Sequence, residues 1–357
     1  MQLFKKVNIH LMPGKLMFAP EWLVLGVNNI CNLHCKMCDV GTQYNGSNFY
    51  QNLMGAKPLN MPRELVLKLI DQAAEHYPKA KIGYAFTEPL VYPHLVKTIA
   101  YANRKGLYTS ITTNALTLRQ KASQLAEAGL DEIFISLDGP PEIHNRIRGH
   151  KSSFQWAMAG IQKLLEHEVR PQISVFCCIT EWNIGHLSEF ADLFRDIPLK
   201  QLGFMHTNYT NQEIAEKHNL LYGTDYPATV SNLEEVNIDN MDLSLLYEEI
   251  QQIRQSTYPF QVIFSPEIHD RMGLDIFYHH PEILIGKRCN DVFRNVMIKS
   301  DGSVIPAHGR CYNLTLGNMY ESTLPEIWNS AVASRFRKDL INAGGLLPAC
   351  SRCCSAF

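Results

Sequence analysis

Cys31-Asn32-Leu33-His34-Cys35-Lys36-Met37-Cys38 is the most informative stretch of this 357-residue chain. Its C-x3-C-x2-C spacing arises by chance roughly once per hundred chains of this length and cysteine content. Three thiolates on one short loop can each bind an iron of a cubane [4Fe–4S] cluster, which leaves the fourth iron without a protein ligand. Such an open position is typical of catalytic metal centres. A zinc knuckle completed by His34 or a distant cysteine is the alternative.

Composition and charge exclude several classes of protein. The 33 basic and 35 acidic side chains nearly cancel, so we expect no nucleic-acid partner. The hydrophobic share of 46% and the charged share of 19% are globular values. We find neither a signal peptide nor an apolar run long enough to span a membrane. We therefore expect a cytoplasmic protein with reduced thiols, so its ten cysteines need a role other than disulfides.

Six short β-like runs alternate with amphipathic helical patterns in the first part of the chain. The runs cover residues 22–27, 81–86, 108–112, 132–136, 172–179 and 201–205. This alternation predicts a parallel sheet with right-handed crossovers. Six such units are too few for a complete eight-stranded barrel. We therefore predict an α/β fold, a partial (β/α)6 TIM-like barrel with a small C-terminal α+β module that binds a cluster.

Polar residues follow four of the predicted strands. The cysteine loop follows the first strand, and Phe86-Thr87-Glu88-Pro89 ends the second. Thr113-Asn114 ends the third strand, and Ser136-Leu137-Asp138-Gly139-Pro140 ends the fourth. Barrel-type α/β folds carry their chemistry at the carboxyl ends of the strands. We therefore expect these four segments to meet at one site.

The chain divides into three predicted parts, a barrel core at 1–206, a connecting region at 207–288 and a tail at 289–357. Within the connecting region, the stretch 208–240 reads as a long irregular insertion, and a strand is expected near 260–264. In the tail, two apolar runs around Asp301-Gly302 indicate a hairpin, and a helix is expected over 325–340.

Seven further cysteines lie outside the loop. Cys177 and Cys178 belong to an apolar run, which favours buried core thiols. The other five are in the tail, and they are Cys289, Cys311, Cys350, Cys353 and Cys354. Four of these five suit a fully ligated iron–sulfur cluster or a zinc ion, and Cys354 is then left over.

These motifs resemble those of the radical S-adenosylmethionine (SAM) enzymes over nearly the whole chain. The resemblance implies a [4Fe–4S] cluster on Cys31, Cys35 and Cys38, with SAM chelating its fourth iron. Residues 86–89 match the Gly-Gly-Glu-Pro motif of the family. Both glycines are replaced here, so a main-chain contact with SAM requires Thr87 to tolerate the backbone geometry.

The resemblance also implies a set of SAM-binding side chains. They are Thr87, Glu88, Asn114, Ser136, Asp138 and Arg148. Arg148 is either a partner of the SAM carboxylate or a solvated charge on a loop.

The tail resembles the SPASM/twitch auxiliary-cluster modules. This implies a second [4Fe–4S] cluster, with ligands Cys289, Cys311, Cys350 and Cys353. Ala307 stands where these modules usually have a cysteine, so Cys311 must substitute for it. We expect a single, twitch-like auxiliary cluster, because the tail is short. Whether Cys353 or Cys354 is the last ligand stays open.

The family resemblance implies an enzyme that reductively cleaves SAM to a 5′-deoxyadenosyl radical, which abstracts hydrogen from a substrate. A flavodoxin or ferredoxin would supply the electron. Only about twenty residues precede the first strand, too few for a peptide-recognition domain, so we expect a small-molecule substrate and an oxidation or rearrangement in a biosynthetic pathway. The alternatives are a peptide-modifying maturase and, from another class, a non-catalytic zinc-stabilised binding protein.

Two residues are candidates for a catalytic role. His206 ends the sixth predicted strand, and a core or loop histidine is its alternative. Cys354, at a mobile tip, is a candidate hydrogen donor, and an inert thiol or a metal ligand is its alternative.

Overall fold

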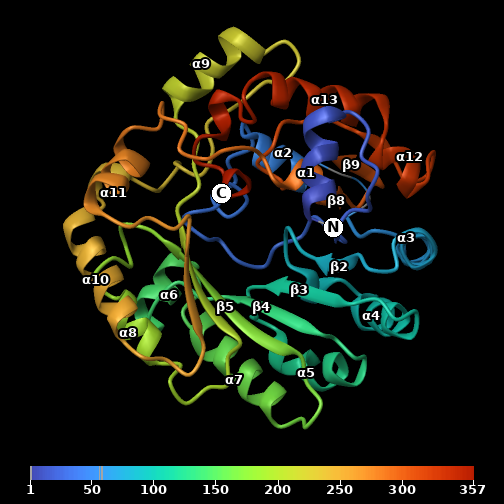
Figure 1. Cartoon of the computed structure of the whole chain (residues 1–357). Helices are drawn as coiled ribbons and strands as arrows, with labels where there is room; N and C mark the ends of the chain where they lie inside the picture. The colour runs from blue at the N-terminus through green and yellow to red at the C-terminus, as the bar shows by residue number, and fades with distance from the viewer. Residues whose placement is uncertain (1, 56, 58) are drawn as a thin grey trace.

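The computed structural model describes residues 2–55, 57 and 59–357, and these contain one sheet of ten strands (Figure 1). The strands are β1 (Trp22–Leu25), β2 (Lys81–Tyr84), β3 (Thr109–Thr113), β4 (Glu132–Ser136), β5 (Gln172–Ile179), β6 (Gln201–His206), β7 (Gln261–Ser265), β8 (Asn295–Ile298), β9 (Ser303–Ile305) and β10 (Gly317–Asn318). Their order across the sheet is β10-β9-β8-β1-β2-β3-β4-β5-β6-β7.

The parallel part of the sheet confirms the predicted α/β fold. The six predicted runs form β1 to β6, and each pairs in parallel with the next. β7 adds a further parallel strand beside β6. On the other edge, β8 pairs in parallel with β1, from Trp22 opposite Asn295 to Leu25 opposite Ile298. Backbone hydrogen bonds therefore join the tail directly to the barrel core. The predicted hairpin is β8–β9, which is antiparallel.

Helices cover the outer side of the curved sheet, and the red tail returns across its open side with the C-terminus inside the curve (Figure 1). The helices are α1 (Gln2–Leu11), α2 (Asn48–Met54), α3 (Arg63–His76), α4 (Leu95–Arg104), α5 (Leu118–Glu127), α6 (Pro141–Ile147), α7 (Ser153–Leu165), α8 (Leu187–Asp192), α9 (Gln212–Tyr222), α10 (Leu243–Gln255), α11 (Arg271–His279), α12 (Leu324–Trp328) and α13 (Ala331–Asn342). None of the described helices is long and apolar enough to cross a membrane.

Two predictions about helices were wrong, and capping side chains explain both. The stretch 208–240 contains α9, which begins where Asn211 accepts a hydrogen bond from the backbone N–H of Ile214. The single helix expected at 325–340 is two helices. Ser330 accepts from the N–H of Ala333 and starts α13, so the chain turns after α12.

The register of β5 and β6 decides which side chains face the barrel interior, because successive residues of a strand point to opposite faces. Cys177 pairs with Phe204, whose ring packs against Phe190 of α8 on the outer side. Cys177 is therefore the predicted core thiol. Cys178 pairs with Met205 on the opposite face. It is only partly buried and faces the interior, so its assignment to the core was wrong.

His206 ends β6 as predicted, but it shares the outer face with Cys177 and is fully buried. Its Nδ1 lies 2.8 Å from the hydroxyl of Tyr278, and its ring packs against Phe277, both in α11. Burial lowers the pKa of His206 from 6.5 to about 3. The imidazole is therefore neutral at ordinary pH and belongs to the packing between the sheet and α11.

Protonation of His206 makes stability depend on pH. The pKa of His206 is lower in the folded chain than in the unfolded chain, so between about pH 3 and 6.5 the unfolded chain binds more protons. The contribution of the neutral imidazole to stability is therefore complete above pH 6.5 and declines as the pH falls. We expect it to decrease by about 1.4 kcal/mol on going from about pH 7.5 to 5.5. Denaturant unfolding of wild type and His206→Phe at both pH values measures the difference. Equal pH dependence in the two proteins would contradict this prediction.

Candidate active site

The cysteine loop follows β1 and lies in a small apolar cluster at the carboxyl ends of the strands. Cys35 is buried, whereas Cys31 and Cys38 are partly buried. The buried residues of this cluster are Leu33, Cys35, Met37, Leu116, Ile147 and Val236. Burial raises the pKa of Cys31 to about 11 and that of Cys38 to about 12, and the nearby Cys35 adds to both shifts. A metal centre bound here must therefore displace protons from these thiols.

Arg148 is the cation of this site. Its Nε donates a hydrogen bond to the Asp138 carboxylate, and its Nη1 lies 3.6 Å from the Cys35 sulfur. Asp138 also accepts from the backbone N–H of Cys178 at 2.9 Å. Arg148 is only 9% exposed, so the alternative of a solvated loop charge was wrong. The sequence correctly predicted that Asp138 and Arg148 lie near the loop.

The backbone on both sides of Arg148 contacts the cysteine loop. Gly149 has a φ of 65°, and a Cβ there would lie 2.8 Å from the carbonyl oxygen of His34. The N–H of Lys36 donates to the carbonyl of Ile147 at 3.0 Å. The side chain of His34 is exposed, whereas Cys35 is buried. His34 is therefore poorly placed to complete a zinc knuckle with the three thiols.

Glu88 joins the ends of β2 and β3. Its buried carboxylate accepts hydrogen bonds from the N–H of Leu90, the hydroxyl of Thr113 and the N–H of Asn114, at 2.6–2.9 Å. Burial raises the pKa of Glu88, and these three hydrogen bonds oppose the shift. The amide of Asn114 in turn donates to Asn32 in the cysteine loop at 2.8 Å. Glu88 and Asn114 thus fix the loop relative to the sheet.

The remaining predicted SAM-binding residues lie beside this network. Thr87 donates to the backbone carbonyl of Asn28 at 2.9 Å. The strained residue of this motif is Phe86, with a φ of 85°, and not Thr87 as the sequence suggested. The ring of Phe86 lies on Gly26, where any Cβ would collide with it. Ser136 ends β4 opposite Phe176, on the face of the sheet that Cys178 shares.

Four tail cysteines line one cavity in the tail. They are Cys289, Cys311, Cys350 and Cys353. The hydroxyl of Tyr312 lies 3.5 Å from the sulfur of Cys350. Four thiolates on one zinc ion would converge to about 4 Å from one another, since Zn–S bonds are about 2.3 Å. A cavity between the thiols therefore suits a cubane cluster better than zinc.

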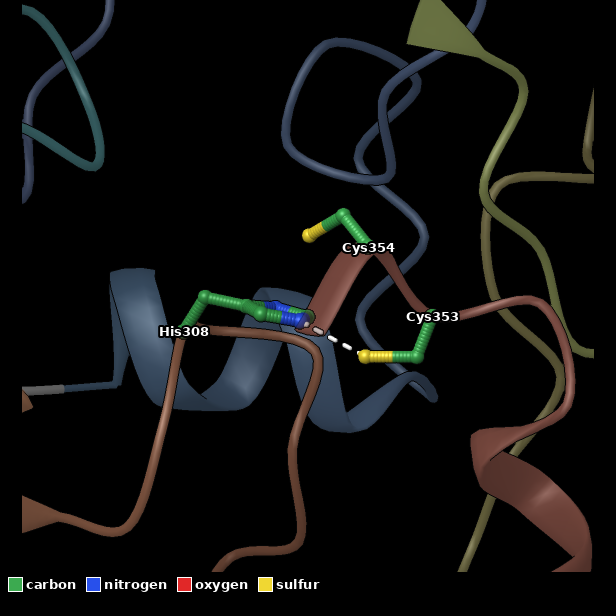
Figure 2. Close-up of side chains that lie close together, drawn as sticks. All are labelled: His308, Cys353 and Cys354. Carbon is green, nitrogen blue, oxygen red and sulfur yellow. Dashed lines mark hydrogen bonds between the residues drawn. The ribbon is translucent and has the colours of Figure 1, made fainter. Parts of the chain in front are cut away.

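The fifth tail cysteine belongs to a separate group beside this cavity, with His308 and Cys353 (Figure 2). The three ligand atoms lie within 4.8 Å of one another, and Nε2 of His308 is 3.0 Å from the Cys353 sulfur. A hydrogen bond from Cys354, together with His308, lowers the pKa of Cys353, while the pKa of Cys354 is raised. Cys353 thus loses its proton more readily than Cys354. Sequence reasoning missed His308, whose only signal was its place directly after Ala307.

The connecting region reaches the cysteine loop through Asp39, which is fully buried. Its carboxylate accepts from the hydroxyl of Ser231 at 2.8 Å and from the N–H of Asn232 at 2.7 Å. Nearby, the N–H of Asn48 donates to the hydroxyl of Thr229 at 2.8 Å. The segment after α9 therefore folds over the loop and bounds the open side of the barrel.

Comparison with protein families gives two matches, one for each part of the chain that carries a cysteine set. Residues 26–194 match the radical SAM superfamily, and residues 289–354 match the SPASM family, described as an iron-sulfur cluster-binding domain. These matches confirm the predicted [4Fe–4S] cluster with SAM, and they indicate an iron–sulfur centre in the tail. They also confirm an enzyme, so the non-catalytic zinc protein is not supported.

Similar proteins cover nearly the whole chain. The tungsten-containing aldehyde ferredoxin oxidoreductase cofactor-modifying protein of Pyrococcus furiosus is 25% identical, over 93% of this chain and 87% of that protein. The Fe-coproporphyrin III synthase of Methanosarcina barkeri is 23% identical, over 98% of this chain and 84% of that protein. The crystal structure of Streptococcus suis SuiB bound to precursor peptide SuiA has a TM-score of 0.62 at 16% identity, over 98% of this chain and 75% of SuiB.

The structure thus agrees with both family matches. It has a cysteine loop beside a buried arginine in a partial barrel, and a tail with its own thiol-lined cavity. The chain belongs to the radical SAM superfamily and carries a C-terminal SPASM domain.

Proposed function

We propose that this enzyme uses two [4Fe–4S] clusters to carry out a SAM-dependent radical oxidation or rearrangement of a small molecule. Cys31, Cys35 and Cys38 hold the cluster that binds SAM, and the four cavity-lining tail cysteines hold the auxiliary cluster. The observation that supports two different roles is the contrast between three thiols on one loop and four thiols that line one cavity. With the loop cluster and SAM bound, the site supplies a 5′-deoxyadenosyl radical that takes a hydrogen atom from the substrate.

The protein side chains bind and orient SAM in this proposal. Asp138 holds the Arg148 guanidinium beside Cys35, so its remaining donors can meet the SAM carboxylate. Glu88 and Asn114 hold the two neighbouring strand ends against the loop. The SAM-contacting set is Thr87, Glu88, Asn114, Ser136, Asp138 and Arg148. The electron comes from an external reducing partner such as a flavodoxin or a ferredoxin.

Two observations support a small-molecule substrate. The two relatives named above are described as a cofactor-modifying protein and as a synthase of Fe-coproporphyrin III, and both are similar over nearly the whole chain. In addition, the segment after α9 is bonded to Asp39 and bounds the open side of the barrel. A peptide substrate is the second candidate, because SuiB has the same fold and its structure holds a precursor peptide.

Substrate-dependent formation of 5′-deoxyadenosine tests the substrate class. We expect the anaerobic, reduced enzyme with SAM to respond to a pool of small metabolites and not to a pool of peptides from the same cells. A matched reaction without the pool measures uncoupled cleavage. Stimulation by peptides alone would overturn the small-molecule proposal in favour of the maturase.

Iron content tests the first ligand set. Wild-type protein with two clusters should hold about eight irons per chain. Replacing Cys31, Cys35 and Cys38 together by Ala removes one set of thiolates, so we expect about four irons and no SAM cleavage. Cys177→Ala, a buried thiol on the outer face of β5, is the matched control and should keep both clusters. Deoxyadenosine from the triple variant would refute the assignment.

The iron content of two single variants tests whether Cys353 or Cys354 is the last ligand of the auxiliary cluster. Cys353 lines the cavity and loses its proton more readily than Cys354, so Cys353→Ala should lose about four irons, whereas Cys354→Ala should keep both clusters. Loss of iron from Cys354→Ala instead would make Cys354 the ligand.

The Cys354→Ala variant also tests Cys354 as a hydrogen donor, because loss of a donor stops product formation while SAM cleavage continues. Unchanged turnover would exclude that role.

A further inference from the structure

Arg310 is a partly buried arginine whose guanidinium lies over the ring of Phe49, 6.0 Å from the ring centroid. Its Nε and Nη1 atoms are buried and make no hydrogen bond among the described residues. The buried arginines are satisfied, since Arg148 pairs with Asp138 and both Arg337 and Arg352 donate to backbone carbonyls. A buried donor without an acceptor is destabilising. The two buried nitrogens of Arg310 are therefore placed to bind a group that the chain itself does not supply.

The position of Arg310 lies between the two cysteine sets. The residue lines the thiol-lined cavity of the tail together with Cys311 and Cys353. The same cavity is lined by Asn48, at the start of α2 after the cysteine loop, and by Thr210, just after β6. The cavity that Arg310 lines therefore adjoins the carboxyl end of the barrel as well as the tail.

The backbone around Arg310 is fixed before any ligand binds. The amide of Asn52 in α2 donates to the carbonyls of both neighbours, Gly309 at 2.8 Å and Cys311 at 2.9 Å. The N–H of Arg310 donates to Nδ1 of His308 at 3.2 Å. A Cβ at Gly309 would lie 2.7 Å from Leu53, so α2 packs directly on this turn. A preorganised donor binds its ligand with less loss of conformational entropy.

Buried carboxylates near the two sites already have other donors. Asp138 is bonded to Arg148, and Asp39 to Ser231 and Asn232. In the tail, Asp291 accepts from the hydroxyl of Ser355 at 2.6 Å. The partner of Arg310 is therefore an anion from outside the chain or the charge of the auxiliary cluster itself, and these two possibilities predict different measurements.

We propose that Arg310 binds an oxyanion group of the substrate, a carboxylate or a phosphate, and so holds the substrate between the two clusters. The planar guanidinium presents parallel N–H donors that match two oxygens of such a group. This inference rests on the proposed function, because it takes the space between the clusters as the substrate site. It adds that the small-molecule substrate is anionic.

Anion binding to the protein with both clusters in place tests the role of Arg310 directly. We expect calorimetry to detect binding of succinate or inorganic phosphate, and no binding of the neutral analogue succinamide. Arg310→Gln should weaken anion binding at least about tenfold, and Arg310→Lys should recover only part of it, since lysine lacks the fork. Arg119→Gln, an exposed arginine of α5, is the matched control. The anion that binds more tightly, succinate or phosphate, shows whether the oxyanion group of the substrate is a carboxylate or a phosphate.

Two results of this experiment would overturn the proposal. One is that neither anion binds wild type more tightly than Arg310→Gln. The other is that Arg310→Gln leaves anion binding unchanged but removes iron or shifts the midpoint potential of the auxiliary cluster, which would pair the guanidinium with the cluster. Iron content and potential are therefore measured for every variant.

Fractionating the metabolite pool by anion exchange tests whether the substrate is anionic, independently of whether the enzyme acts on a small molecule. We expect the retained, anionic fraction to stimulate deoxyadenosine formation. If only the unretained fraction does so, the anionic substrate is wrong while the small-molecule enzyme stands. If no fraction stimulates cleavage although Arg310 binds anions, the proposed function fails and the binding site stands.

Discussion

The ion pair between Arg148 and Asp138 is the interaction on which the geometry of the SAM site depends. Asp138 follows β4, its other oxygen accepts from the N–H of Cys178 in β5, and the guanidinium reaches Cys35 in the loop after β1. One buried pair thus connects three strand ends. A buried guanidinium needs acceptors for its donors, so Asp138 fixes where Arg148 can lie, and Arg148 in turn places positive charge at the thiols.

The tail also has an arginine beside a set of cysteines, but its surroundings differ from those of Arg148. Arg310 is less buried than Arg148, but its buried Nε and Nη1 have no hydrogen bond among the described residues, and hydrogen bonds from Asn52 hold the turn that carries it. Arg148 is thus neutralised by the fold, whereas we propose that Arg310 binds a ligand. The contrast follows from the same desolvation argument, because buried donors are stable where an acceptor satisfies them.

Local patterns were sufficient to predict the strands, the cysteine loop and the strand ends that surround it. Predictions failed where tertiary contacts decide the outcome. Adjacent cysteines must face opposite sides of β5, but the packing of Phe204 on α8 determines that Cys178 is the one facing inward. Nothing in the sequence indicated that Phe86 has the positive φ of this motif, or that its ring packs on Gly26, which lies far away in the sequence. His308 and Arg310 had no motif, since their roles arise from contacts with distant parts of the chain.

The pairing of β8 with β1 limits what the enzyme can accommodate. Four residues of β1, Trp22–Leu25, are hydrogen-bonded in register to β8, and the same strand leads into the cysteine loop. The tail module is therefore attached through a continuous sheet and not through a flexible linker, and the two cysteine sets keep a fixed relation. A substrate that binds between them, as proposed above, therefore meets walls whose separation the continuous sheet keeps fixed. This constraint favours a compact molecule positioned by one charged group over a long chain that needs an extended groove.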